Sequence, residues 1–445
     1  MALTPENIIK ESISYAKQTE ARARRREIEK SVNYYTATNI DKYIRTYFNA
    51  KSFQEIPTYC VNVTRKFIDK KSRIYTLAPD RKTNTNQKQY NNLTRFKDLR
   101  MKHVERMTNL LGTPGLRVLW NEDEDGGFFD YRLLYYYDAH FVEDDVYNPY
   151  AITYPILSPS QDPMYTEKCK YSYWDSQINI IYDENGAILD EFENPYGVLP
   201  FLFPRDMEQI DDFYNEGATD VVKTNEHINI AMTELMLGLR FQMFGQPWSS
   251  GVYEDNPITR TGSDTIINLP VDGRFGIESP KGDPNKVIET IKFSLEMLAM
   301  SKHMYVTFES SQDRPSSGLA LKIKDFEYLE DYKDDLSLWR AFEKELYDLE
   351  KIIAGVNGVN LADKMVIDFK EPEYPKSVQE QITKDNWDLE KGLITLPEIL
   401  KRDRSDLTIE QAEAIIEKNL EGQETKDEVE DNGINKPSIS ETTKE

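Results

Sequence analysis

Two helical patterns flank a short segment rich in glycine and proline in the second half of the chain. Residues 209–244 carry apolar or small side chains at alternating steps of four and three, among them Tyr214, Ala218, Val221, Asn225 and Leu235. This stripe predicts one helix, which at 1.5 Å per residue would be roughly 54 Å long. Residues 246–282 contain repeated Gly and Pro and two short strand patterns, 265–269 and 275–277. A helix, a small β-rich excursion and a second helix indicate an architecture rather than a catalytic site.

The second helix has a clear start. Asp283 is placed as an N-cap and Pro284 as the first helical residue. Val287, Ile291, Leu295 and Leu298 then give an apolar face that runs to about Met304. After a polar loop, 310–318, a third helix is predicted from Leu319 to about Ile353, with Trp339, Leu346 and Leu349 on one side and Gly355 as its stop.

The first 205 residues predict an α+β domain with helices first and a mostly antiparallel sheet after them. Helices are expected at 5–30, 59–77 and 88–112, with 31–50 irregular. Strands are expected at 116–120, 131–135, 151–157, 170–174 and 178–182, with a hairpin turn at Asn185-Gly186. A strand at 365–369 should pair with this sheet.

The C-terminal part predicts short capped helices and an acidic tail. Three segments, starting at Ser377, Thr395 and Thr408, match the capping box, in which the cap hydroxyl and the third side chain satisfy free N–H groups. Residues 421–445 carry eight acids against three lysines and few apolar side chains, which predicts disorder.

The charge of the chain limits how it could bind nucleic acid. Its formal net charge is −23, so bulk attraction to phosphates is not expected. An acidic wall could instead surround DNA without gripping it, or the acidity could simply favour solubility. The run from Arg22 to Arg26 could contact nucleic acid, although a solvated helix end is the preferred interpretation. The abundant tyrosines, 27 in all, suit subunit contacts or reflect composition alone.

Residue patterns of known enzymes are missing from the sequence. It contains no phosphate-binding loop, no dinucleotide fingerprint and no nucleophile elbow. The four histidines are isolated, and Cys60 and Cys169 have no metal-ligand spacing, so reduced thiols are expected. Acid pairs such as Asp144-Asp145 and Asp211-Asp212 are attributed to the high acid content. No enzymatic activity, metal or cofactor is expected, and neither a signal peptide nor a membrane-spanning segment is predicted.

Taken together, the order of these segments resembles the portal proteins of long-tailed double-stranded DNA phages. The resemblance rests on the run from Asn194 to Phe201, on Tyr214-Asn215, and on the helix–excursion–helix order. It also rests on the loop 310–318 leading into Leu319-Ala320-Leu321, and on Trp387 with Gly392-Leu393-Ile394-Thr395. It covers about residues 1–420.

The resemblance implies a portal fold with a defined domain map. Residues 1–205 and 319–370 would form the wing, 206–245 and 283–304 the two stem helices, 246–282 the clip, 305–318 the tunnel loop, and 371–420 a helical crown before the acidic tail 421–445. It further implies a ring, usually of twelve subunits in that family, at one capsid vertex of the virion, assembled in the host cytoplasm. The implied partners are other copies of the chain, the major capsid protein, the packaging motor (terminase), the head–tail adaptor protein and double-stranded DNA passing through the channel during packaging and ejection, with no membrane.

Site residues follow from the same resemblance. The channel-facing group would be Lys302, His303, Arg314, Ser316, Ser317 and Gly318, in which the cations could touch phosphates and the small residues permit loop movement; an ordinary exposed loop is the alternative. The partner-binding group in the clip would be Tyr253, Arg260, Ile266, Leu269, Arg274 and Phe275.

Two other classes of protein remain open. A non-viral helical scaffold or oligomerisation protein would share the long helices but form a small closed oligomer. A nuclease with an acidic metal site would lose activity when a single acid such as Asp144 is replaced.

The tunnel-loop assignment makes a direct prediction. Arg314→Ala, or deletion of residues 312–317, should leave ring assembly intact and impair DNA packaging or retention, because only the contact with DNA is removed. Packaged DNA per particle and ring mass are the measurements. Loss of assembly in either variant would contradict the assignment.

Overall fold

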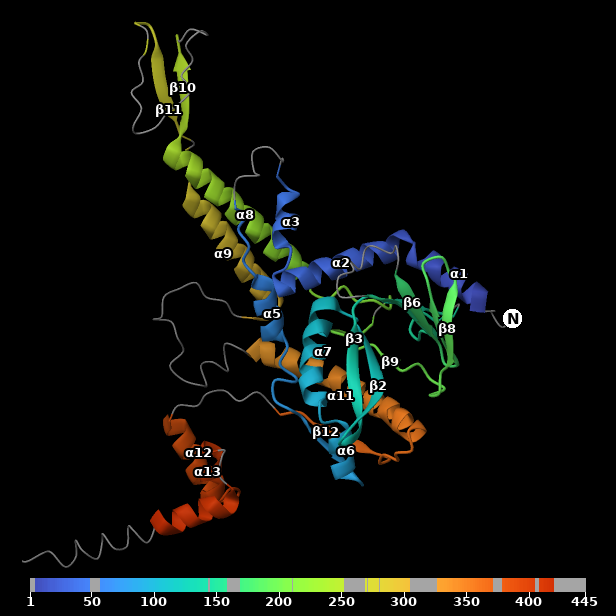
Figure 1. Ribbon diagram of the computed structural model, residues 1–445. Helices are drawn as coiled ribbons and strands as arrows, with labels where there is room; N and C mark the ends of the chain where they lie inside the picture. Colours follow the sequence, from blue (N-terminus) through green and yellow to red (C-terminus); the bar gives the residue numbers. More distant parts are fainter. Residues whose placement is uncertain are drawn as a thin grey trace, which may run out of the picture. The chain divides into compact units, whose positions relative to one another are not determined.

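The chain divides by its internal contacts into two units. Unit 1 comprises Met1–Ser310 and Asp325–Pro372, and unit 2 comprises Ser311–Lys324 and Glu373–Glu445. Both belong to a computed structural model, in which helices and antiparallel strands are mixed, so the fold class is α+β as expected (Figure 1). The residues described are 5–48, 57–142, 145–157, 169–209, 211–251, 269, 271–279, 281–304, 326–370, 378–404 and 408–419.

Unit 1 begins with helices α1 (Pro5–Ala16), α2 (Thr19–Thr36), α3 (Ile40–Arg45) and α5 (Val63–Lys71). The single helix expected at 5–30 is thus two helices, and the irregular segment expected at 31–50 is wrong over most of its length. Tyr34, Ile40 and Ile44 are buried in one core cluster. This tertiary burial outweighs the weak helix propensity of the Tyr- and Asn-rich sequence.

A three-stranded sheet follows helices α6 (Gln87–Leu93) and α7 (Lys97–Leu111), which replace the single helix expected at 88–112. Its strands are β2 (Gly115–Asp123), β3 (Gly126–Leu134) and β9 (Phe201–Leu202), in the order β3-β2-β9. Val118, Phe129 and Tyr131 lie in the core that this sheet shares with α6 and α7.

The second sheet contains the strands β4 (Asp138–His140), β5 (Ala151–Ile156), β6 (Lys170–Trp174), β7 (Ile178–Tyr182) and β8 (Ile188–Glu193) in sequence order. Every pairing is antiparallel, as the hairpin signals predict. One face places Tyr171, Tyr173 and Tyr182 against Ile9 of α1. The opposite face carries Tyr154 and Trp174, which lie in a different cluster.

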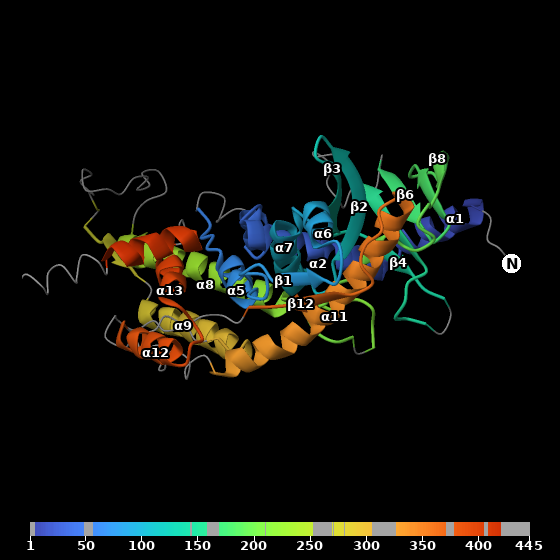
Figure 2. The ribbon, with the colours of Figure 1, turned by 90° about the horizontal axis from the view of Figure 1, so that it is seen from below.

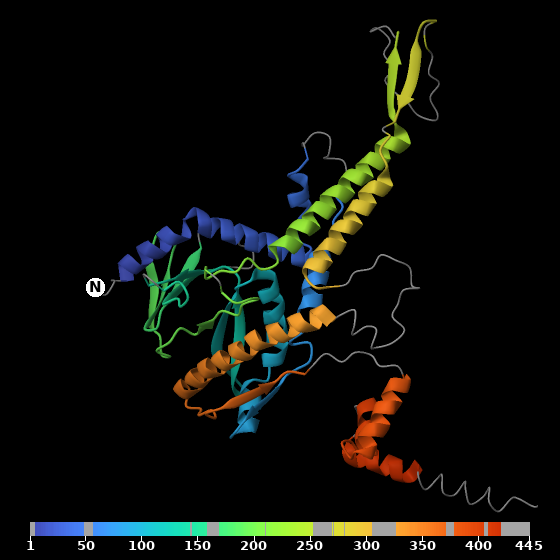
Figure 3. The same cartoon turned by 180° about the vertical axis from the view of Figure 1, so that it is seen from behind.

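An arm built from two helices extends from this body (Figures 1 and 3). Helix α8 (Thr219–Phe244) leads into a hairpin of β10 (Gln246–Ser250) and β11 (Arg274–Glu278), and α9 (Pro284–Ser301) returns beside α8. The Asp283 carboxylate accepts the Asn285 N–H at 3.0 Å, so the predicted cap of α9 is confirmed. Strand β10 was not predicted, whereas β11 covers the predicted strand at 275–277.

Helix α8 is shorter than its sequence stripe suggested. It has 26 residues, which makes it roughly 39 Å long rather than 54 Å. Tyr214 belongs to a turn before the helix, where its hydroxyl accepts the Ala139 N–H at 2.8 Å and its ring packs beside Phe213. Gly217 has φ +62°, and a Cβ there would lie 2.5 Å from the Leu110 carbonyl oxygen. The turn at Gly217 therefore packs against the end of α7, and this close approach prevents α8 from starting earlier in the chain.

The last elements of unit 1 return to the body. Helix α11 (Phe326–Val356) buries Trp339, Leu346, Leu349 and Ile353, as predicted, and it ends one residue after the expected stop. Strand β12 (Met365–Asp368) pairs with β1 (Asp80–Thr83) in a separate two-stranded sheet. The expectation that it joins the main sheet is therefore wrong. Figure 2 shows β12 beside α11.

Buried ion pairs fix α11 to the body. Lys97 Nζ lies 3.1 Å from Glu343 and 2.8 Å from Glu350, and all three side chains are fully buried. Arg81 adds a second cation at 2.6 Å from Glu343. Burial alone would raise the pKa of Glu343, but Lys97 and Arg81 outweigh it and lower that pKa to about 2. The network joins β1, α7 and α11 through charge as well as apolar contact.

The arginine run at 22–26 serves the fold. Arg24 Nη2 lies 2.7 Å from Asp138, and Arg25 pairs with the other oxygen of the same carboxylate. Arg25 is only 3% exposed, and the Arg24 guanidinium lies 3.8 Å from the centre of the Tyr214 ring. The expectation of a solvated helix end is wrong for these two arginines, because they hold α2 to the second sheet.

Unit 2 contains α12 (Val378–Glu390), α13 (Leu396–Asp403) and a helix at 409–419. Two predicted capping boxes are confirmed. The Glu398 carboxylate accepts the Thr395 N–H at 2.8 Å, and Gln411 accepts the Thr408 N–H at 3.0 Å. Ser377 and the acidic tail lie outside the described residues.

Replacing Lys97 tests the buried network. Lys97→Met should lower the free energy of unfolding by about 3–5 kcal/mol, because Glu343 and Glu350 would be left with too little buried positive charge. The deficit should shrink as the pH falls from the ordinary glutamate pKa toward 2. Ionised Glu343 contributes its full stability above the ordinary pKa, and this contribution is lost as the pH approaches its folded-state pKa. Urea unfolding at several pH values measures both effects. Lys88→Met, at an exposed position of α6, is the matched control, and equal deficits in the two variants would contradict the account.

Candidate functional site

The arm is the most distinctive candidate site, because its root is buried and its outer part is exposed. At the root, Val221, Val222, Leu298 and Ala299 belong to the same core cluster as Tyr34 and Ile44 of the body. Further out, α8 and α9 enclose a gap of about 180 Å³ lined by Leu235, Leu239 and Val287, among other residues. The predicted apolar face of α9 therefore faces α8.

A second apolar stripe on α9 has no cover within the described part of the chain. Phe293 is 61% exposed and Met300 67% exposed, and Met297 between them is about half exposed. Their steps of four and three place them on one side of the helix. Contiguous exposed apolar side chains of this kind mark contact surfaces.

The hairpin at the end of the arm also exposes large apolar side chains. Trp248, Val271 and Ile277 are exposed there, and a Cβ at Gly276 would lie 2.6 Å from the Trp248 ring, so glycine is required opposite this indole. Of the predicted partner-binding residues, Arg274 is exposed and Phe275 half-buried on β11, and Leu269 is exposed just before it. Tyr253, Arg260 and Ile266 lie outside the described residues.

Lys302 and His303, the two predicted channel residues that the structure describes, each contact an acid. Lys302 Nζ lies 2.9 Å from Asp220, and His303 Nδ1 lies 2.8 Å from Asp331 of α11. His303 has φ +50°, a left-handed conformation that ends the turn after α9. Lys302 therefore links the end of α9 to α8, and His303 links it to α11. Arg314, Ser316, Ser317 and Gly318 lie outside the described residues.

Further charges gather beside this junction. A pocket of about 210 Å³ is lined by Lys71, Lys302, Asp331 and Asp335, among others. Burial, together with neighbouring carboxylates such as Asp331, raises the pKa of Asp335 to about 6 even though Lys71 opposes it. The junction of α9 with α11 is therefore a mixed-charge site rather than a free basic one.

A ladder of polar side chains on α8 binds the backbone of residues 59–63, which lead into the first residue of α5. Asn225 Oδ1 accepts the Val63 N–H at 2.8 Å, and Asn229 Oδ1 accepts the Val61 N–H at 2.8 Å. Thr233 Oγ1 accepts the Tyr59 N–H at 3.0 Å. Four helical residues rise about 6 Å and two extended residues about 6.6 Å, so the two repeats nearly match. All three side chains are buried.

Glu226 completes the attachment of the arm. Its carboxylate lies 2.8 Å from Lys30 Nζ, and it accepts longer hydrogen bonds from the hydroxyls of Tyr34 and Tyr47, both at 3.4 Å. Sequence reasoning missed Glu226, Asn229 and Thr233 and counted Asn225 as part of an apolar stripe. The available signal was the repeat of short polar residues every four positions, at 225, 229 and 233. A helix face that only meets water does not require polar residues at such a regular spacing.

Acids of the two pairs noted in the sequence, and one of the four histidines, have structural partners. The Asp145 carboxylate accepts the backbone N–H groups of Tyr147 and Asn148, and Asp212 accepts that of Phe213. Burial lowers the pKa of His140 to about 4, and its ring nitrogen lies 2.8 Å from the Thr153 hydroxyl. Among the described residues, no three His, Cys, Asp or Glu side chains are grouped to hold a metal ion. Asp144 lies outside the described residues.

Comparison with known proteins assigns no family. Neither a scan against protein-family models nor a search of curated proteins found a match to this chain. Within the described residues, no helix combines the length and apolar character needed to cross a bilayer.

The polar ladder predicts a local loss of protection. Asn229→Leu should leave the backbone N–H and C=O of Val61 without partners, a cost of about 1–3 kcal/mol. Amide exchange across residues 59–63 should then accelerate roughly ten- to hundredfold, as measured by mass spectrometry on peptides from this segment. Lys223→Ala, at an exposed position of the same helix, should leave exchange unchanged. Unaltered exchange in Asn229→Leu would contradict the ladder.

Proposed function

We propose that this chain is a portal protein of a long-tailed double-stranded DNA phage. In this role about a dozen copies form a ring at one capsid vertex, which conducts DNA during packaging and ejection. The chain itself carries out no catalysis, and ATP hydrolysis belongs to the packaging motor that docks on the ring. The protein would reside in the virion after assembly in the host cytoplasm.

The observation that carries the proposal is the arm with its uncovered stripe. Phe293, Met297 and Met300 lie on the side of α9 that α8 does not cover. A neighbouring arm placed in the same orientation would bury this stripe on a different surface of the next subunit. Such a heterologous contact repeats around an axis, and it closes into a ring when the rotation between neighbouring subunits divides a full turn evenly. The two helices correspond to a portal stem, and the β10–β11 hairpin to its clip.

Other parts of the chain suit the remaining contacts. The exposed Trp248, Val271 and Ile277, with Leu269, Arg274 and Phe275, would meet the packaging motor and later the head–tail adaptor. The α+β body would contact the major capsid protein as a wing, and the helices of unit 2 would form the crown. Net charge −23 would discourage DNA from adhering to the channel.

The paired state of Lys302 and His303 refines their proposed role. Beside Asp220, Lys302 would offer DNA an ion pair instead of a free cation, and His303 is held by a hydrogen bond with Asp331. A wall of this kind supports passage of DNA over tight binding, because few phosphate counterions would be released. Direct phosphate contact would then fall to Arg314 in the tunnel loop.

A closed scaffold is the alternative that the same stripe allows. Two arms packed face to face about a two-fold axis would also bury Phe293 and Met297, but in a dimer rather than a ring. The stoichiometry of the assembly separates these two classes of protein.

Removing the stripe should disassemble the ring without unfolding the chain. Phe293→Ser combined with Met297→Ser should give folded monomers, since exposed positions contribute little to the stability of one chain. Sedimentation measures the assembly and circular dichroism the fold. Lys292→Ala with Glu296→Ala, at exposed neighbouring positions of α9, is the control and should still assemble. A double-serine variant that assembles normally would overturn the stem assignment.

A further inference from the structure

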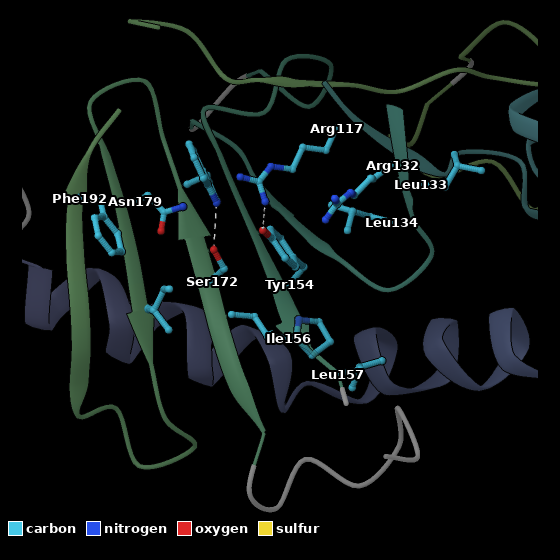
Figure 4. Close-up of a pocket in the computed structure, with 13 residues that line it drawn as sticks. Arg117, Arg132, Leu133, Leu134, Tyr154, Ile156, Leu157, Ser172, Asn179 and Phe192 are labelled. Atoms are coloured by element: carbon cyan, nitrogen blue, oxygen red, sulfur yellow. Dashed lines mark hydrogen bonds between the residues drawn. The ribbon is translucent and has the colours of Figure 1, made fainter. Parts of the chain in front are cut away.

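A cleft of about 580 Å³ opens between the second sheet and strands β2 and β3 (Figure 4). Its volume is typical of sites that hold a small organic ligand or the end of a peptide. The sheet contributes the face opposite to α1, including Tyr154 and Trp174, whereas Arg117 and Arg132 come from β2 and β3. The cleft takes no part in the arm or in the buried network around Lys97.

Arg117 is a partly buried cation without a counter-ion. Its Nη1 donates to the Tyr154 hydroxyl at 2.8 Å, and its guanidinium lies 4.6 Å from the centre of the Trp174 ring. Within the described chain, no carboxylate lies within ion-pair distance of this guanidinium. Burial lowers the pKa of Arg117 and the nearby Arg132 adds to the effect, as expected for a cation whose charge is not balanced.

The free edge of this guanidinium suits an oxyanion. Because Tyr154 occupies Nη1, the two nitrogens that lie side by side on the other edge, Nε and Nη2, have no acceptor among the described residues. A carboxylate accepts two parallel N–H groups arranged in this way. Stacking on Trp174 and the bond to Tyr154 already fix the orientation of the edge, so little side-chain entropy is lost when an anion binds.

Asn179 places a second unpaired group beside the same indole. It is the register partner of Trp174 on the neighbouring strand β7, so the two side chains are neighbours on one face of the sheet. Asn179 is only 6% exposed, and its Oδ1 has no hydrogen-bond donor in the part of the chain that the structure describes. A buried carbonyl oxygen without a donor is costly. The soft last torsion of Asn lets the amide turn this oxygen toward the cleft that it lines.

Apolar side chains complete the cleft. Phe192, the register partner of Asn179 on β8, and Ile156 are both exposed at its rim. A hydrated inorganic anion would leave these surfaces in contact with water. The ligand that matches every feature has an oxyanion for Arg117, an N–H group for Asn179 and an apolar group for the rim. The last residue of a polypeptide combines all three within one amino acid.

We propose that the cleft binds the C-terminal residue of a partner polypeptide that ends in a large apolar side chain. The terminal carboxylate pairs with the Nε–Nη2 edge of Arg117, and the N–H of the same residue donates to Asn179 Oδ1. Its side chain covers Ile156 and Phe192. The net charge of −23 repels acidic partners in general, so an unbalanced arginine inside a cleft selects one carboxylate locally. This site belongs to the body of each subunit and does not depend on the proposed ring.

Short peptides test the site on the full-length protein. Acetyl-Gly-Phe with a free carboxylate should bind, as measured by isothermal titration calorimetry. The same peptide with a C-terminal amide should bind at least roughly tenfold more weakly, because it brings no charge to Arg117. Acetyl-Asp-Phe amide keeps a carboxylate but has no charged chain end, and it should bind as weakly as the first amide. Equal affinity of the free acid and its amide, or tightest binding of the Asp-containing amide, would overturn the proposal.

Substitutions connect binding to the two unpaired side chains. Arg117→Gln should weaken binding of the free acid at least roughly tenfold, whereas Arg26→Gln, at an exposed position of α2, is the matched control and should not. Asn179→Leu should also weaken binding, yet it should raise the melting temperature of the unliganded protein because a buried unpaired oxygen is removed. Loss of binding in a stabilised variant cannot result from unfolding.

The outcome for Asn179→Leu also shows which role its amide has. A lower melting temperature with unchanged peptide affinity would mean that Asn179 serves only the fold, and this result would contradict the proposed site. Sedimentation of all three variants should match that of the wild type, because none of the replaced side chains lies on the arm. Failure of the peptide experiments would therefore leave the proposed ring untouched, and failure of ring assembly would leave the cleft site untouched.

Discussion

Attachment of the arm to the body depends on hydrogen bonds from α8 to the backbone of residues 59–63. Asn225, Asn229 and Thr233 each satisfy one N–H group of that segment, at distances from 2.8 to 3.0 Å. Buried backbone groups need partners, so the segment and the helix fix each other's register. With Glu226 held by Lys30, the root of α8 has a defined position. Any force on the outer arm would therefore reach the body through these contacts.

The body has its own rigid element in the ion pairs around Lys97. Because Glu343 and Glu350 are fully buried, α11 cannot shift along α7 without leaving a charge unpaired. The junction between α9 and α11 is different, since Lys302, His303, Asp220 and Asp331 are partly exposed there. A body held by buried ion pairs, an arm root held by hydrogen bonds and a more solvated junction would suit the ring proposed above.

Local patterns in the sequence predicted local structure well. Strands β6 and β7, the cap of α9 and two capping boxes could be predicted because alternation and capping depend on neighbouring residues. Contacts between distant segments could not. The start of α8 depends on the close contact of Gly217 with the Leu110 carbonyl. The burial and pairing of Arg24 and Arg25 depend on Asp138, which lies over a hundred residues away in the sequence. At the arm, the sequence indicated the helices and part of the hairpin, but it did not reveal the acids that pair with Lys302 and His303.

The central claim is that identical copies of this chain form a ring around a channel. Electron microscopy of the purified full-length protein, combined with a mass measurement of the assembly, tests this claim most directly. The account predicts closed rings with a central channel and roughly a dozen subunits, since the proposed contact is heterologous and its rotation closes. Particles that remain monomers or two-fold dimers at every concentration would contradict it.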